Sequence, residues 1–380
     1  MKTKAGKWLR LFIVVFLMLL LCCASTVVVL DPYFHYHKPL PSFSYVLNNE
    51  RAQNDGITKH FAYDTLLTGT SLVEVMKASE VERQFGGAAV KVTFAGASYY
   101  EINRNIELAF ATHPHLKRVI RCLDMEYYFD DPKALRTNMG VYPTWLYNRN
   151  PFDDVRYLFN REVLFTLCGD MIRKKLANEA GGITSFDDYA NWMPDVTADD
   201  FGAEALLGGM KPFGTPERIN HLTEEEKRLL RANIRENVTK TAKKHPDCVF
   251  DYFISPYSGL WWAQTYEAGD LAKVLEAEEI VVSEIVACPN IHLYSYNTDT
   301  SLTWNLDNYK DPLHYGDWIG EELLVFMKRD EGRITKQNMK AYLKKERELY
   351  ETLDYAQWMK EELEGKYSGK TETKRGFGSK

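Results

Sequence analysis

Apolar residues along the chain form one long uninterrupted run and a series of short ones. The long run covers residues 11–30, twenty residues without a charge. A helix of that length can cross a hydrocarbon core of roughly 30 Å. The run therefore predicts a transmembrane helix near the N-terminus. The short runs that follow are rich in β-branched and aromatic residues and alternate with helical patterns, as in βαβ units.

Five of the short runs are predicted to be strands. Most are apolar on both faces, which is typical of a parallel sheet covered by helices on both sides. The predicted strands are 64–69, 89–95, 118–123, 248–255 and 291–296, and the predicted helices include 71–85, 99–112 and 269–288. This alternation predicts an α/β fold, a three-layer doubly wound parallel sheet behind the membrane helix.

The same patterns divide the chain into four parts. Residues 1–30 form a cytoplasmic stub and the membrane helix, 31–60 a connector, 61–330 the α/β domain, and 331–380 a helical extension with a polar tail. A stretch rich in Gly, Pro and Asp at about 130–246 reads as an insertion into the domain. Because ligands bind at the carboxyl edge of parallel strands, the insertion is expected to lie there and shape the substrate site.

Charge predicts the side of the membrane on which the domain lies. Four cations and no acidic residue precede the apolar run, and Asp31 follows it. The positive-inside tendency then leaves the N-terminus in the cytoplasm and the domain outside. The alternative is a cleaved signal peptide with residues 24–26 as the cleavage site, and it also exports the domain.

The net charge of the chain argues against nucleic acid as a partner. It is −6 overall, and about −10 once the four N-terminal cations are set aside. Such a surface lacks the positive field that neutralises phosphates.

The first candidate for chemistry is Ser71, which directly follows the first predicted strand in the block Gly69-Thr70-Ser71-Leu72. A serine at the end of a parallel strand and the start of a helix lies at the open edge of the sheet. Free N–H groups and the helix dipole favour a developing oxyanion there. The structural alternative is an N-cap serine that only satisfies backbone donors.

The second candidate is the pair Asp311 and His314, about a dozen residues after the last predicted strand. A histidine can take the proton of a hydroxyl nucleophile, and a carboxylate on its other ring nitrogen fixes the tautomer. The alternative is a loop histidine with ordinary surface hydrogen bonds.

Together these blocks resemble the SGNH/GDSL hydrolase superfamily over about residues 62–320. The Ser71 block matches the GDSL block with Thr70 in place of Asp, and Gly96 matches the glycine that helps form the oxyanion hole. The resemblance implies an SGNH/flavodoxin-like fold and a catalytic triad of Ser71, His314 and Asp311. It also implies that the backbone N–H groups of Ser71 and Gly96 bind the oxyanion.

One block departs from that pattern, because Asp124 stands where the superfamily has an asparagine. An ionised aspartate cannot donate a hydrogen bond to an oxyanion. Asp124 and Thr70 are therefore candidates for substrate binding or for a structural role. Tyr257 and Trp261, after the fourth strand, could stack on sugar rings, with core packing as the alternative. Ser258 is a weaker rival nucleophile without a predicted base.

No metal or cofactor is expected. The cysteines show no CxxC spacing, and the chain has no phosphate-binding loop. The pairs His35/His37 and His113/His115 lack a carboxylate at the spacing of a zinc site.

A divergent SGNH domain behind one membrane helix resembles the proteins of alginate-type polysaccharide O-acetylation and teichoic-acid D-alanylation. That resemblance implies a serine acyltransferase or esterase that acts on acyl groups, expected to be acetyl, of a cell-surface polysaccharide. A membrane-bound O-acyltransferase is the implied partner. Two alternatives remain: a plain esterase of carbohydrate or lipid, and a catalytically silent scaffold that binds polymer or that partner.

Overall fold

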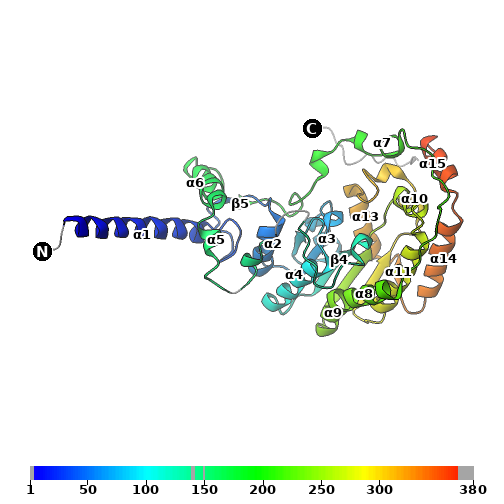
Figure 1. The fold of residues 1–380 in the computed structure, drawn as a ribbon, viewed down its shortest axis with the longest axis horizontal. Coiled ribbons are helices and arrows are strands. Elements are labelled where there is room, and N and C mark those ends of the chain that lie inside the picture. The colour runs from blue at the N-terminus through cyan, green and yellow to red at the C-terminus, as the bar shows by residue number, and fades with distance from the viewer. Residues whose placement is uncertain (1–3, 138–141, 149, 367–380) are drawn as a thin grey trace. The chain divides into compact units, whose positions relative to one another are not determined.

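The computed structural model describes residues 4–137, 142–148 and 150–366, and the chain divides into two compact units (Figure 1). Unit 1 comprises Met1–Phe61 and Val141–Ser185, and unit 2 comprises Ala62–Gly140 and Phe186–Lys380. Residues 141–185 thus share a unit with the N-terminal helix, whereas the expected insertion spans about 130–246. The predicted polar tail lies outside the described residues beyond residue 366, and the predicted domain boundaries stay a prediction.

A six-stranded sheet organises unit 2, in the order β3-β2-β4-β6-β7-β8. The first five strands are parallel and β8 is antiparallel to β7. The strands are β2 (Thr65–Gly69), β3 (Ala89–Thr93), β4 (Arg118–Leu123), β6 (Val249–Ile254), β7 (Ile291–Ser295) and β8 (Arg333–Ile334). Each of the five predicted strands is present, and its residues are mostly buried, as runs apolar on both faces require. The two-residue β8 was not predicted because it is too short to carry a pattern.

Helices precede, connect and follow these strands, so a mixed α/β class with a mostly parallel sheet is confirmed. The helices of unit 2 are α3 (Ala78–Phe85), α4 (Tyr99–Thr112), α7 (Ala203–Leu207), α8 (Glu224–Ile234), α9 (Lys240–Lys244), α10 (Gly259–Glu267), α11 (Leu271–Ile285), α12 (Thr300–Thr303), α13 (Asp317–Lys328), α14 (Met339–Thr352) and α15 (Tyr355–Leu363). The predicted helices 99–112 and 269–288 correspond to α4 and α11.

The segment after β2 is not the single helix predicted for 71–85. It forms a short 3-10 turn, η1 (Ser71–Val73), and α3 begins only after it. Three carbonyl oxygens that a continuous helix would bond internally accept hydrogen bonds from distant side chains. These are Ser71 O from Trp192 Nε1 (3.4 Å), Leu72 O from Tyr315 OH (2.8 Å) and Glu74 O from Lys91 Nζ (2.6 Å). Ser71 O also accepts the Glu74 N–H of the 3-10 turn. Tertiary donors therefore override the helical pattern at this turn.

Unit 1 is built around the N-terminal helix α1 (Lys4–Leu30), which is long and apolar enough to cross a membrane. The unit also contains α2 (Glu50–His60), α5 (Val155–Leu158), the π-helical turn η4 (Glu162–Leu167) and α6 (Cys168–Leu176). Strand β1 (Ser44–Tyr45) pairs in parallel with β5 (Gly182–Ile183). This pairing connects the chain after α1 to the end of the second segment of unit 1, residues 141–185.

Candidate active site

The structure brings Ser71, His314 and Asp311 together at the carboxyl edge of the sheet in unit 2. Ser71 Oγ lies 2.8 Å from His314 Nε2. On the other side of the ring, His314 Nδ1 lies 2.8 Å and 3.0 Å from the two carboxylate oxygens of Asp311. In this order the imidazole can take the proton of the serine hydroxyl, and the carboxylate can orient the ring and stabilise the imidazolium that forms.

The loop that carries Asp311 and His314 is closed by two buried tyrosines. Tyr309 and Tyr315 pair across the loop as an antiparallel bridge, and the Lys310 N–H donates to His314 O (3.0 Å). The Tyr309 hydroxyl donates to Pro256 O and the Tyr315 hydroxyl to Leu72 O, each at 2.8 Å. The loop is therefore fastened to the end of β6 and to the turn that holds the serine.

Asp311 is organised to stay ionised beside the imidazole. Its Oδ1 accepts the backbone N–H groups of Leu313 (2.9 Å) and His314 (2.8 Å) in addition to the ring. Burial alone would raise the pKa of the Asp311 carboxyl, but these hydrogen bonds and the His314 ring together lower it. Lys310 Nζ lies 3.9 Å from Asp311 Oδ2 and adds a positive charge nearby.

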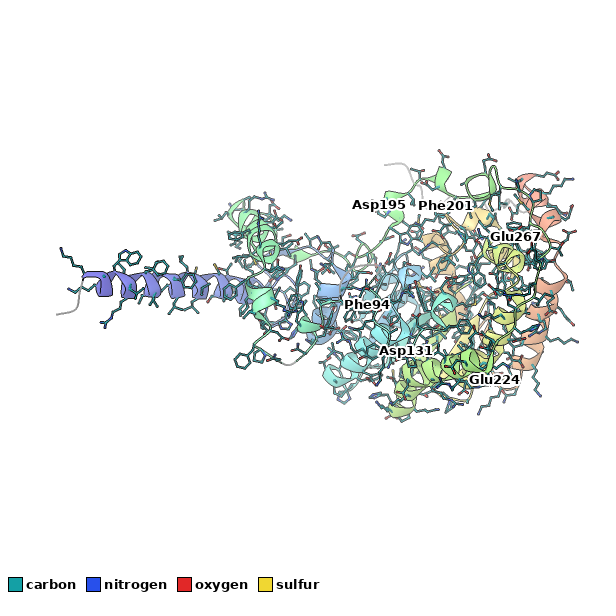
Figure 2. All side chains as sticks on the ribbon, in the orientation of Figure 1. Phe94, Asp131, Asp195, Phe201, Glu224 and Glu267 are labelled. Atoms are coloured by element: carbon teal, nitrogen blue, oxygen red, sulfur yellow. The ribbon has the colours of Figure 1, made fainter. Side chains whose placement is uncertain are left out.

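Trp192 was not singled out from the sequence, yet it contacts the His314 ring and the backbone carbonyl of Ser71. Its ring meets the His314 ring edge-on with centroids 5.9 Å apart, and its Nε1 donates to Ser71 O. Lys310 Nζ lies 4.3 Å from the centroid of the same indole, within range of a cation–π contact. Trp192 precedes a 3-10 turn that ends at Asp195, which Figure 2 labels. The only signal in the sequence is a tryptophan in a polar, turn-rich stretch.

Two backbone N–H groups are available for an oxyanion at this edge. Phe94, labelled in Figure 2, follows β3, and its N–H donates to Gly69 O (2.9 Å), so the turn after β3 lies beside the Ser71 turn. Gly96 in that turn has φ +60°, a conformation that glycine adopts without strain. Within the described part of the chain, neither the Ser71 N–H nor the Gly96 N–H donates to a protein acceptor.

Asp124 anchors a buried polar cluster next to the Ser71 turn. It is 4% exposed, and its two oxygens accept hydrogen bonds from the Thr70 hydroxyl (2.8 Å), the Tyr257 hydroxyl and the Glu126 N–H (3.1 Å). Burial raises the pKa of Asp124, against the opposing effect of these donors. The Thr70 hydroxyl and the Tyr257 hydroxyl each direct their proton to Asp124. Thr70 and Tyr257 are therefore positioned as structural partners of the Asp124 carboxylate.

Trp261 lies at the edge of that cluster and is partly exposed. Its Nε1 donates to Glu126 Oε1 (2.8 Å), and its ring packs edge-on against the buried ring of Tyr257, with centroids 4.7 Å apart. Ser258 is different, because it is fully buried and its hydroxyl donates to Pro312 O (2.8 Å) while it caps α10. No base lies against Ser258, whereas Ser71 has one.

Three of the four histidines considered for metal have other partners. His35 faces Asp154, His37 bonds two backbone carbonyls, and His113 Nδ1 lies 3.0 Å from the Thr112 hydroxyl. Among the described residues no group of three or more His, Cys, Asp or Glu side chains has the arrangement of a metal site. The cysteines outside α1 are buried and unpaired by disulfides, namely Cys122, Cys168, Cys248 and Cys288.

Comparison with known proteins adds little to this geometry. No family model matches the chain, and no curated protein matches it. One solved structure, described as "The structure of a putative platelet activating factor from Streptococcus pneumonia", is similar at 12% sequence identity. The match covers 77% of this chain and 91% of that one, with a TM-score of 0.34. Fold and site together define a mixed α/β protein with a candidate Ser-His-Asp site, and that description rests on the geometry alone.

Proposed function

We propose that this chain is a membrane-anchored serine acyltransferase or esterase of the SGNH type, with a three-layer α/β domain. Ser71 is the nucleophile, His314 the base, Asp311 the orienting carboxylate, and the Ser71 and Gly96 N–H groups the oxyanion donors. The substrate class is an acylated cell-surface polysaccharide, and the expected acyl group is acetyl. The observation that carries the proposal is the continuous line of contacts from Ser71 Oγ through His314 to Asp311.

The chemistry follows from these contacts. As Ser71 Oγ attacks an acyl carbonyl, its proton passes to His314 Nε2 and the negative charge on the carbonyl oxygen is met by backbone N–H groups. The departing alkoxide takes the proton from His314, which leaves an ester on Ser71. A polymer hydroxyl, or water in the esterase case, then gives its proton to His314 and attacks that ester. The bond from the acyl carbon to Ser71 Oγ breaks, the acyl group leaves on the acceptor, and His314 returns the proton to Ser71 Oγ.

The anchor is part of the same proposal. A retained α1 with the N-terminus in the cytoplasm places the domain outside the membrane, beside a membrane-bound O-acyltransferase that supplies acyl groups. Retention is supported by the length of the apolar run, since twenty residues without a charge suffice to span the hydrocarbon core. Val27 and Leu30 at the end of α1 are buried in unit 1 at 0% and 4% exposure, so the helix ends against this unit.

The test is covalent labelling of the detergent-solubilised full chain with a fluorophosphonate probe, followed by intact mass and peptide mapping. We expect a single adduct on Ser71, and its loss in Ser71→Ala and His314→Ala. Ser283→Ala is the matched control, because that hydroxyl lies on the exposed face of α11 and only bonds Glu279 O. Labelling of folded protein elsewhere than Ser71 would reject the assignment.

A second candidate function is a catalytically silent scaffold that binds polymer or the membrane-bound partner. The observation that favours it is Asp124, whose oxygens accept hydrogen bonds where the superfamily asparagine would donate one. Absence of any adduct on folded, monodisperse protein, with and without the membrane partner, would favour the scaffold. An adduct on Ser71 would exclude it.

A further inference from the structure

Unit 1 exposes large apolar side chains beside the end of α1. We call them the 152–176 patch, and they come from the segment that contains α5, η4 and α6. The patch consists of Phe152 (85% exposed), Val155 (51%), Phe159 (43%), Phe165 (72%), Ile172 (40%) and Leu176 (78%). Six large apolar side chains of this exposure within one short segment favour a partner surface.

The patch belongs to the part of unit 1 that packs on the membrane helix. Elements α5, η4 and α6 all contact α1, and Figure 1 shows α5 and α6 at its C-terminal end. Val27 and Leu30 are the buried residues of α1, so the contacts lie on its last turns. The rest of the helix presents its apolar side chains outward, as a membrane span does.

The length of α1 sets the depth of these contacts. A helix of 27 residues is about 40 Å long, against a hydrocarbon core of roughly 30 Å. Arg10 is the last cation before the apolar run, so the core begins near residue 11 and ends near Leu30. Elements that pack on Val27 and Leu30 therefore lie at the bilayer interface.

The chain after α1 is tied to the same end of the helix. Asp31 is fully buried and accepts the backbone N–H groups of His35 (2.9 Å), Tyr36 (2.7 Å) and His37 (2.9 Å). The His37 ring lies 2.9 Å from Val28 O through Nε2 and 2.6 Å from Lys38 O through Nδ1. Burial lowers the pKa of His37, but these two carbonyls and the nearby Asp31 carboxylate together raise it. A positive charge suits a helix C-terminus, and the ring ties the chain after α1 to the last turns of that helix.

We propose that the 152–176 patch is a second membrane contact, inserted into the lipid interface of the bilayer that α1 spans. The segment that carries the patch has no net charge, because five cations (Arg156, Arg161, Arg173, Lys174, Lys175) are matched by five carboxylates (Asp153, Asp154, Glu162, Asp170, Glu179). The contact is therefore apolar in character and does not depend on anionic lipid. It holds unit 1 at a fixed depth, and it is independent of the chemistry proposed for Ser71.

The test is photo-crosslinking of the full chain in nanodiscs of phosphatidylcholine. A benzoylphenylalanine residue replaces Phe165 or Leu176, and in the control it replaces Ile219, a 62% exposed side chain of unit 2. All three positions are exposed, so the replacements leave core packing intact. We expect lipid adducts at 165 and 176 in at least about tenfold higher yield than at 219, since an inserted aromatic ring is held among acyl chains.

Three outcomes would overturn the proposal. Lipid yields at 165 and 176 equal to that at 219 would show that the patch meets water. Adducts mainly to a second protein chain would show that it is a protein interface. Yields that require phosphatidylglycerol and disappear at high salt would show an electrostatic contact in place of an apolar one. None of these readouts involves Ser71, so failure here is distinct from failure of the proposed activity.

Discussion

Two aspartates are connected to the Ser71 turn, Asp311 through His314 and Asp124 through Thr70, and their surroundings differ. Asp311 lies in a loop with its side chain 36% exposed and bonds an imidazole whose charge can change. Asp124 is buried and bonds the hydroxyls of Thr70 and Tyr257 and one backbone N–H. The same residue type therefore has the surroundings of the proposed proton transfer in one place and of fixed geometry in the other, and its partners make the difference.

The largest expected effect separates the two aspartates by rate. Asp311→Asn should slow acylation of Ser71 by about 10²–10⁴-fold, because the amide no longer stabilises the imidazolium or fixes the tautomer of His314. The measurement is the rate of fluorophosphonate labelling followed by intact mass.

Asp124→Asn is the matched comparison, since it makes the same change of chemistry beside the same turn. Its labelling rate should stay within about tenfold of the native rate, because the side chain points to hydroxyls and not to a reacting atom. Equal losses in the two variants would remove the distinction between the aspartates. A faster rate in Asp124→Asn would show that the amide donates to the oxyanion.

The second prediction separates the two regions by stability. Asp124→Ala should lower the free energy of unfolding by about 1–3 kcal/mol, since it leaves the hydroxyls of Thr70 and Tyr257 buried without an acceptor. Denaturant titration of the solubilised chain measures the change. Asp199→Ala, at an exposed position, is the control and should stay within about 0.5 kcal/mol. Equal stability of the two variants would contradict a structural role for Asp124.

How far the sequence predicts this molecule depends on whether a signal is local. The strands follow from short apolar runs, and all five predicted ones are present. The helix expected directly after β2 is broken because Trp192, Tyr315 and Lys91 donate to its carbonyls. No local pattern could show donors that lie up to 243 positions away.

In the candidate site, too, the features with a local signal were predicted and those that depend on long-range contacts were not. Ser71, Asp311 and His314 were predicted from their places in the strand order, and the structure brings them within hydrogen-bonding distance. The departure at Asp124 was visible as a residue type, but its bond to Tyr257, 133 positions away, was not. Trp192 was missed because its role depends on how a turn-rich loop packs.

The third prediction uses pH to sharpen the contrast. The pKa of Asp311 is lowered in the folded chain, so its stabilisation is present above the usual aspartate pKa and is lost as pH falls through the lower folded value. The pKa of Asp124 is raised by burial, so its contribution is present at low pH and is lost as pH rises through the higher folded value. The difference in unfolding midpoint, native chain minus Asn variant, measured between about pH 3 and pH 7, should therefore rise with pH for Asp311 and fall with pH for Asp124. A difference that changes with pH in the same direction for both aspartates would contradict the surroundings described for Asp311 and Asp124.

The smallest expected effect concerns Trp192, whose ring packs against His314. Trp192→Phe keeps an aromatic ring against His314 but loses the long hydrogen bond to Ser71 O. We expect a labelling rate within about threefold of native, since one weak neutral hydrogen bond contributes on the order of 0.5 kcal/mol.

Trp192→Ala removes the ring as well and should slow labelling by about tenfold, because His314 gains freedom to leave the geometry that faces Ser71. Both variants should leave the pH dependence of labelling unchanged if the indole only positions the ring. A shifted pH profile in Trp192→Phe would instead mean that the indole affects the ionisation of the Asp311 and His314 pair. The loop that carries Trp192 would then share the electrostatic role of Asp311.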